Sequence, residues 1–224
     1  MIQGFTTDLR MFLPPLLEGV LMTIQLTAVS FLLAIVIGLI VCLCRISQLP
    51  VISKVAIAYI EIIRGTPLLL QLFYIYYALP DVGIRLPAFQ AGVAGLSINF
   101  GAYLAELFRA GIQSIETGQT QAARSLGMTT AQMMRYVILP QAFRVIFPAL
   151  ANYALVLVKD SSLVAVLSVR ELMRAGELLA SSTFRTMKVF TLVGLIYLIV
   201  SYALSFGFRQ YEKRLRIPGD DNHR

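Results

Sequence analysis

Long apolar runs separated by short polar segments dominate the chain. Five stretches contain no Asp, Glu, Lys or Arg: Gly19–Cys44, Gly65–Pro80, Leu86–Ala105, Val145–Val158 and Val189–Phe208. At about 1.5 Å of rise per residue, a helix needs roughly 20 residues to cross about 30 Å of hydrocarbon. The first, third and fifth stretches are long enough alone, and the other two become long enough with their flanks. The pattern predicts an all-α integral membrane protein with about five spans, at about 17–44, 55–80, 86–107, 141–160 and 188–209.

Composition supports this class. The 224 residues are 58% hydrophobic and 14% charged, against roughly 45–50% and about 25% in soluble domains. No second domain is indicated, so we expect a single transmembrane domain over residues 1–224.

The distribution of Lys and Arg predicts the orientation. With the N-terminus outside, twelve of these residues fall on the cytoplasmic side and seven on the other side. The positive-inside tendency therefore favours an N-out, C-in arrangement. The net charge of +7 is dispersed over the loops, which indicates topology and contact with anionic lipid rather than nucleic-acid binding.

Residues capable of catalysis or metal binding are sparse. The single histidine, His223, lies in the polar tail, and the two cysteines, Cys42 and Cys44, end the first apolar run. No nucleophile, base and orienting group can be assembled, and no phosphate-binding loop is present. We therefore predict no catalytic residue, no metal site and no cofactor bound by this chain.

The polar segment at about 110–140 has the pattern of a helical hairpin. Ser114 to Leu126 favours a helix, and Gly127 stands where a left-handed C-cap would end it. Thr129 and Gln132 have the spacing of a capping box for a second helix, which we expect to stop at Pro140. Such a hairpin is either a docking surface for a soluble partner or an amphipathic element lying on the membrane.

One spaced motif in this hairpin resembles a known family. Gln121-Ala122-Ala123, then Gly127, then Val137-Ile138-Leu139-Pro140 is similar to the coupling-loop signature of ABC importer permeases. The likeness departs at Gln121, where the family usually has Glu, and at Val137, where it usually has Ile. It extends to Glu61–Gln71 and Lys159–Leu163, and the chain as a whole resembles the polar amino-acid branch (histidine, glutamine or arginine type).

This resemblance implies a subunit without catalysis of its own in a bacterial inner membrane. It would form half of a translocation pathway with a second permease, identical or related. A pair of ATPase subunits would hold ATP and Mg, and an extracytoplasmic binding protein would deliver the amino acid. The residues implied in ATPase coupling are Gln121, Ala122, Ala123, Leu126, Gly127, Leu139 and Pro140.

Polar residues within apolar spans are candidates for the substrate pathway, because such groups are costly in lipid and usually face a cavity or a partner helix. They are Ser97, Asn99, Tyr103, Asn152, Lys159, Asp160, Ser161 and Ser162. Asp160 and Lys159 would suit the ammonium and carboxylate of an amino acid. The alternatives are hydrogen bonds between helices for Ser97 and Asn99, and ion pairs with the outer loop for Lys159 and Asp160.

Two further segments have a local prediction. Arg64-Gly65-Thr66-Pro67 predicts a kink at a span entrance, with Arg64 near lipid headgroups or a carboxylate of another subunit. Val169–Lys188 has the helical spacing of an outer surface helix, either a docking face for a binding protein or a simple cap.

A self-contained secondary transporter or channel for small polar solutes is the rival function, and a membrane scaffold is a second rival. The transporter or channel is not favoured, because the spans show neither a series of membrane-embedded carboxylates nor an inverted repeat. A scaffold would not explain the hairpin.

Overall fold

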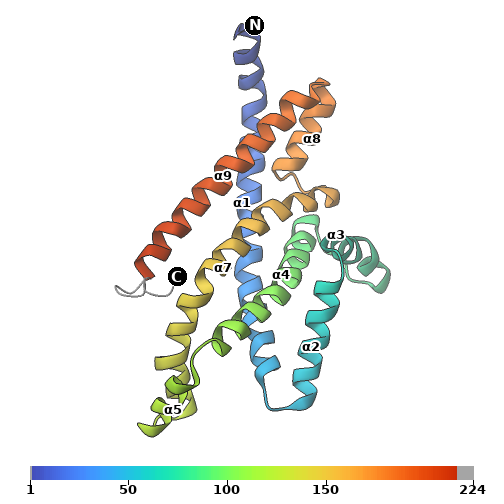
Figure 1. Cartoon of the computed structure of the whole chain (residues 1–224). Coiled ribbons are helices and arrows are strands. Elements are labelled where there is room, and N and C mark those ends of the chain that lie inside the picture. The colour runs from blue at the N-terminus through green and yellow to red at the C-terminus, as the bar shows by residue number, and fades with distance from the viewer. Residues whose placement is uncertain (1, 216–224) are drawn as a thin grey trace.

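The computed structural model describes residues 2–215, with side chains from residue 10 onward, and these form helices joined by short turns (Figure 1). His223 and two of the twelve basic residues counted above on the cytoplasmic side, Arg216 and Arg224, lie outside the described residues. The elements are α1 (Ile2–Ile46), α2 (Pro50–Gly65), α3 (Leu68–Phe73), the π-helical turn η1 (Tyr74–Ala78), the 3-10 turn η2 (Leu79–Val82), α4 (Ala88–Gln113), α5 (Thr117–Ser125), α6 (Thr130–Met133), the π-helical turn η3 (Met134–Ile138), α7 (Leu139–Asp160), the 3-10 turn η4 (Ser161–Leu167), α8 (Leu172–Thr183) and α9 (Thr186–Leu215).

Among the described residues, four helical segments are long and apolar enough to cross a membrane, and there are five if a bent pair counts as one span. The four are Arg10–Ile46, Ala88–Gln113, Thr130–Leu167 and Thr186–Leu215, and the bent pair is Pro50–Gly65 with Leu68–Val82. The all-helical membrane fold expected from the apolar pattern is confirmed.

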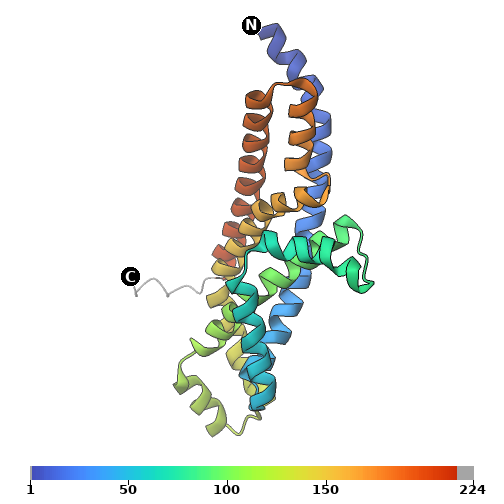
Figure 2. The ribbon, with the colours of Figure 1, turned by 90° about the vertical axis from the view of Figure 1, so that its right-hand side faces the viewer.

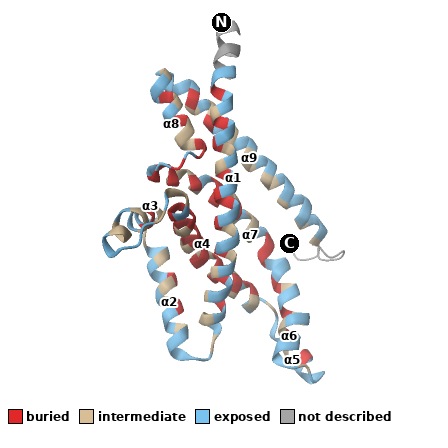
Figure 3. Cartoon of the chain, turned by 180° about the vertical axis from the view of Figure 1, so that it is seen from behind, coloured by how far each residue is buried: buried red, intermediate tan, exposed pale blue. Residues whose placement is uncertain are grey.

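Helix α4 is the centre of the bundle. In its most apolar 18-residue window 72% of residues are buried, against 11% in the corresponding window of α9. Figure 3 shows the same contrast, with α4 largely red and α9 largely pale blue. Gly111 lets α4 approach α7 closely, since a Cβ there would lie 2.0 Å from Cγ2 of Ile146. The helices therefore pack around α4, and α9 leaves most of its surface for lipid.

The hairpin of α5 and α6 lies at the end of the molecule opposite the N-terminus, which is also the end of the turn between α1 and α2 (Figures 1 and 2). Helix α8 lies toward the other end, beside the N-terminal half of α1. The α5–α6 hairpin and α8 therefore lie toward opposite ends of the molecule.

Glu171 anchors α8 to its neighbours. Its carboxylate is fully buried and accepts hydrogen bonds from the N–H groups of Met173 (2.9 Å) and Arg174 (2.7 Å) and from the hydroxyl of Tyr197 (2.8 Å). The N–H of Leu172 donates to Oγ1 of Thr23 at 3.1 Å. Burial raises the pKa of Glu171, while the three donors oppose that rise. One side of α8 thus packs against α1 and α9, while Leu178, Ser181 and Ser182 are exposed on the other side.

The prediction that a helix stops at Pro140 is wrong. One continuous helical segment runs from Thr130 to Leu167, and Pro140 sits in the first turn of α7. The turn before it, η3, is widened to a π-helix in which the N–H of Leu139 reaches the carbonyl of Met134. Proline lacks an N–H and crowds the preceding turn, and the wide turn accommodates both effects, so the hairpin continues directly into a membrane span.

Candidate functional site

A cavity with polar and charged lining residues lies at a sharp bend between α2 and α3. The two helices meet at 104°, so the expected kink at Arg64–Pro67 is confirmed. Thr66 has extended backbone, with φ −118° and ψ 144°, as expected for a residue that precedes proline. We call the turn formed by Gly65, Thr66 and Pro67 the elbow.

Gln71 holds the elbow in shape. Its Nε2 donates to the carbonyl of Ile63 at 2.8 Å and to Oγ1 of Thr66 at 2.8 Å, satisfying backbone and side-chain acceptors that the broken helix leaves free. Its Oε1 accepts a hydrogen bond of 3.0 Å from Nδ2 of Asn99 on α4. Because Gln71 and Asn99 are both buried, this chain of hydrogen bonds fixes the elbow against the central helix.

The cavity beside the elbow, which we call the polar pocket, has a volume of about 500 Å³. The elbow with its flanking residues and the helices α4 and α7 form its wall. The lining residues are Arg64, Gly65, Thr66, Pro67, Leu68, Asn99, Phe100, Tyr103, Tyr153, Val156 and Asp160. Its volume is in the usual range for small-molecule sites, about 300–1,000 Å³.

Charge and aromatic rings meet in the polar pocket. The guanidinium of Arg64 lies 5.1 Å from the centre of the Tyr103 ring, a distance at which a cation is attracted to the ring face. Tyr103 and Tyr153 have ring centres 6.0 Å apart. Neither Arg64 nor Asp160 has an ion-pair partner within 4.0 Å among the residues described. The polar pocket therefore offers one cation and one carboxylate, both without a close partner, to a ligand.

Of the predicted pathway residues, only Asn99, Tyr103 and Asp160 line this cavity. Ser97 bonds to the carbonyls of Val93 (2.6 Å) and Ser30 (3.2 Å). The hydroxyls of Ser161 and Ser162 donate to the carbonyls of Val158 and Lys159, each at 2.7 Å. These three serines thus satisfy backbone acceptors away from the polar pocket.

Arg64 is a charged lining residue that sequence analysis did not place in the pathway, and Tyr153 is a second polar one. A signal for Arg64 was present, since it is a charged residue next to Gly-Thr-Pro at a predicted kink. What could not be inferred was the distance between the elbow and α7, which depends on how both pack on α4.

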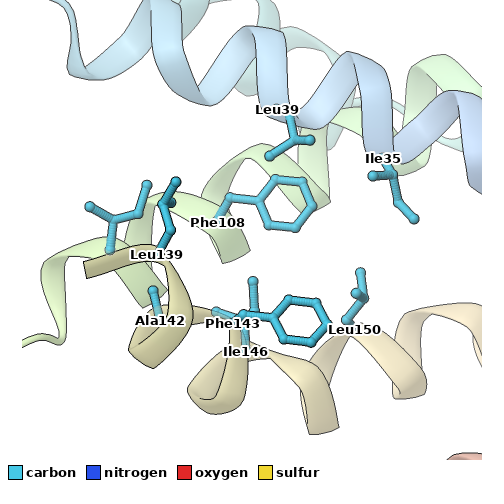
Figure 4. A pocket seen from close by; sticks show the side chains of 9 residues that line it. Ile35, Leu39, Phe108, Leu139, Ala142, Phe143, Ile146 and Leu150 are labelled. Atoms are coloured by element: carbon cyan, nitrogen blue, oxygen red, sulfur yellow. The ribbon is translucent and has the colours of Figure 1, made fainter. Parts of the chain in front are cut away.

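A second cavity, of about 290 Å³, lies between α1, α4 and α7 (Figure 4). Its walls are hydrocarbon side chains, including Leu39, Phe108 and Phe143. With no polar group facing it, this cavity does not suit a polar ligand, and the polar pocket remains the candidate binding site.

The hairpin is fixed at its turn by two capping motifs. Gly127 has φ +74°, and the N–H groups of Gly127 and Met128 donate to the carbonyls of Arg124 (2.9 Å) and Ala123 (3.1 Å), which is the Schellman pattern. The capping box of Thr129 and Gln132 follows at once. Both caps were predicted and both are confirmed.

Within the hairpin, small and large apolar side chains form a separate core. Ala123, Met133 and Ile138 are buried together. Ala123 therefore supports the hairpin from inside, whereas Leu126 is 78% exposed. Gln121, Ala122, Gly127, Leu139 and Pro140 also lie on the exposed surface.

We expect Gly127→Ala to loosen the hairpin, while Gly118→Ala leaves it intact. An added Cβ meets nothing within 4 Å at either position, but only Gly127 has a positive φ. A left-handed conformation costs a non-glycine residue about 1–2 kcal/mol, whereas alanine favours the helix that contains Gly118. Hydrogen exchange of the amides in 121–132 should be faster in the first variant only; equal exchange in both would contradict the role assigned to the cap.

Residues 30–217 match the family described as "Binding-protein-dependent transport system inner membrane component". The chain is 41% identical over 199 residues to the probable glutamine ABC transporter permease protein GlnM of Bacillus subtilis (strain 168), covering 89% of this chain and 92% of the relative. It is 36% identical over 205 residues to the arginine transport system permease protein ArtQ of the same organism, covering 91% and 94%. Its fold is similar to "Crystal structure of an amino acid ABC transporter with histidines", with a TM-score of 0.88, 41% identity and coverage of 93% and 97%.

Proposed function

Because this chain belongs to the family of binding-protein-dependent transport system inner membrane components, we propose that it lines half of the pathway by which an ATP-driven importer moves polar amino acids. Proteins of this family are non-catalytic, multi-pass subunits of ABC importers in the inner membrane, and the ATPase is a separate subunit. The self-contained transporter and the scaffold are therefore set aside.

The observation that supports an amino-acid substrate is the composition of the polar pocket. An α-amino acid at neutral pH carries an ammonium and a carboxylate, and Asp160 and Arg64 face the same cavity with the matching opposite charges. A guanidinium binds a carboxylate with two parallel hydrogen bonds, and a carboxylate accepts readily from an ammonium. The amide of Asn99 and the hydroxyls of Tyr103 and Tyr153 would be available to hydrogen-bond the polar side chain of the substrate.

The exposed surface of the hairpin is the proposed contact with the ATPase. Leu126 projects from it beside the small Ala122, one turn earlier, so an apolar knob stands on a rigid, capped support. The hairpin continues without a break through η3 into α7. Helix α7 also carries Asp160. A movement of the ATPase pair would therefore reach the polar pocket through a single helical segment, as alternating access requires.

Orientation and outer partners belong to the same proposal. The hairpin lies at the same end as the turn between α1 and α2 (Figure 1). Arg45 is in the last turn of α1 before that turn, and Lys54 is in the first part of α2 after it. We place this end in the cytoplasm, with ATP and Mg held by the ATPase pair. The opposite end, with α8, faces the extracytoplasmic binding protein.

Binding measurements on the purified permease–ATPase complex test the substrate class without the binding protein. We expect radiolabelled glutamine or arginine to bind and to be displaced by other polar α-amino acids. Analogues lacking the α-ammonium or the α-carboxylate should compete at least tenfold more weakly, because each leaves Asp160 or Arg64 without its partner. If both analogues competed as strongly as intact polar α-amino acids, the assignment of the two charges would be contradicted.

A further inference from the structure

The second cavity, which we call the apolar cavity, lies where the hairpin joins the bundle. It is lined by Ile112, in the last turn of α4, and by Leu139, the first residue of α7. The hairpin of α5 and α6 connects these two positions along the chain. Figure 4 shows Leu39 of α1 and Phe108 of α4 opposite the lining side chains of α7. A ligand in the apolar cavity would therefore touch α1 and both ends of the hairpin.

The apolar cavity opens between α1 and α7. Leu39 and Phe143 line it, yet they are 46% and 41% exposed, whereas Phe108 and Ile146 form a buried inner wall. Leu39 also belongs to the charge-free run Gly19–Cys44. The opening between α1 and α7 therefore faces the hydrocarbon of the membrane.

The depth of the apolar cavity matches one leaflet of a bilayer. Its lining on α7 runs from Leu139 to Leu150, eleven residues or about 16 Å along the helix. That length is comparable with half of the roughly 30 Å hydrocarbon core. Leu150 lies in the charge-free run Val145–Val158, and Leu139 lies next to the polar hairpin. The apolar cavity thus has one end in hydrocarbon and one end near the membrane surface.

The walls of the apolar cavity suit a hydrocarbon chain. Every lining side chain is aliphatic or a phenyl ring, so water would find no hydrogen-bond partner there. Empty space would leave the walls without dispersion contacts on one side. An acyl chain of the surrounding lipid restores those contacts and reaches the opening without crossing water.

Arg135 supplies a charge at the surface end of the apolar cavity. It lies four residues before Leu139 in the wide turn η3, about one turn away on the same side of the helical segment. Its side chain is exposed and makes no ion pair within 4.0 Å among the residues that the structure describes. The guanidinium lies 5.6 Å from the centre of the Tyr136 ring. A guanidinium binds phosphate oxygens with paired hydrogen bonds, so Arg135 complements the headgroup of an anionic phospholipid.

We propose that the apolar cavity is a binding site for one anionic membrane phospholipid. An acyl chain fills the space between α1, α4 and α7, and Arg135 binds the phosphate. The bound lipid ties α1 to the two ends of the hairpin. This site is separate from the polar pocket, and its test needs no transport measurement.

Photo-crosslinking with a labelled lipid tests the site. The purified full-length chain, with the subunits that co-purify, is placed in proteoliposomes containing phosphatidylglycerol with a diazirine in the middle of one acyl chain. A parallel sample contains phosphatidylcholine with the same modified chain. After irradiation, mass spectrometry measures the yield of lipid adduct at Phe108 and Ile146 in the apolar cavity and at Leu198 on α9.

Exposure and specific binding predict opposite orders of labelling. Leu198 is 64% exposed, against 6% for Phe108 and 9% for Ile146, so random contact with lipid labels Leu198 most. We expect the yield from phosphatidylglycerol at Phe108 and Ile146 to exceed that at Leu198 by roughly fivefold, because a chain held between packed walls stays beside the same atoms. Yields that follow exposure would overturn the site.

Two substitutions that fill the apolar cavity check that the adducts arise inside it. Ala142→Phe enlarges a buried lining residue and Leu39→Phe enlarges a lining residue at the opening. Each should lower the adduct yield at Ile146 by roughly fivefold and leave Leu198 unchanged, because the added volume excludes the chain. Ala110→Phe, at an exposed position of α4 outside the lining, is the matched control. Unchanged labelling of Ile146 in a folded Leu39→Phe variant would contradict an acyl chain in the apolar cavity.

Arg135→Gln tests the headgroup contact. We expect it to lower the adduct yield from phosphatidylglycerol roughly tenfold, to the level given by phosphatidylcholine, because it removes a charge-assisted hydrogen bond. Arg144→Gln is the control, since Arg144 is also exposed on α7 but lies nine residues after Arg135, on another side of the helix. Equal yields from the two lipids in the wild-type chain would overturn the anionic-lipid assignment.

Discussion

Replacing Asp160 by asparagine is expected to lower ATP-driven amino-acid uptake by roughly 100-fold. The change keeps the size of the side chain and removes the negative charge that the substrate ammonium would meet in the polar pocket. A charge-assisted contact of this kind contributes about 3 kcal/mol, and each 1.4 kcal/mol corresponds to about tenfold. Initial uptake rates in proteoliposomes, together with equilibrium binding to the purified complex, measure the loss.

The matched control for this prediction is Asp81→Asn. Asp81 is an exposed residue of η2 outside the polar pocket, so its amide variant should transport at the wild-type rate. The ATPase should co-purify equally with both variants, because neither change touches the hairpin. Wild-type uptake by Asp160→Asn would show that the carboxylate of Asp160 does not bind the substrate.

Replacing Leu126 by aspartate is expected to abolish uptake and to reduce the co-purified ATPase at least tenfold. Leu126 is the most exposed large apolar side chain of the hairpin, at 78%, and in the proposed complex it enters a groove of the ATPase. A carboxylate in such a groove would be desolvated without a partner, at a cost of several kcal/mol. Quantitative immunoblotting of the ATPase after purification in mild detergent measures the loss.

Val82→Asp is the control for the hairpin, since it makes a similar change at another exposed apolar position. Val82 is 72% exposed and ends η2, away from the hairpin, and we expect it to retain the ATPase. Amino-acid binding by Leu126→Asp should remain close to wild type, because the polar pocket is unchanged. Normal ATPase recovery with Leu126→Asp would exclude this residue from the contact.

Local signals in the sequence predicted local structure well. The capping box at Thr129 and Gln132 and the left-handed Gly127 depend on residues within one or two turns, and both are present. The kink before Pro67 follows from the same kind of short-range steric rule. The long charge-free runs predicted the membrane spans equally directly, because the cost of burying a charge in lipid acts on each segment by itself.

Features that depend on distant partners were not predictable in the same way. Pro140 was expected to end a helix, but the π-helical turn at η3 allows the helix to continue. Arg64 enters the polar pocket because the elbow is held on α4 by Gln71 and Asn99, a contact between residues 28 positions apart. Ser161 and Ser162 have the composition of a ligand site, yet their hydroxyls bond to carbonyls of α7.

Reconstituted transport is the most direct test of the central claim, that this chain moves amino acids only when a separate ATPase drives it. Proteoliposomes would contain the chain with its ATPase and binding protein, or the chain alone, and the uptake of labelled glutamine and arginine would be compared with and without ATP. We predict uptake against a gradient only in the complete system with ATP, and none with the chain alone under an imposed proton or sodium gradient. Concentrative uptake by the chain alone would contradict the account and would identify a secondary transporter.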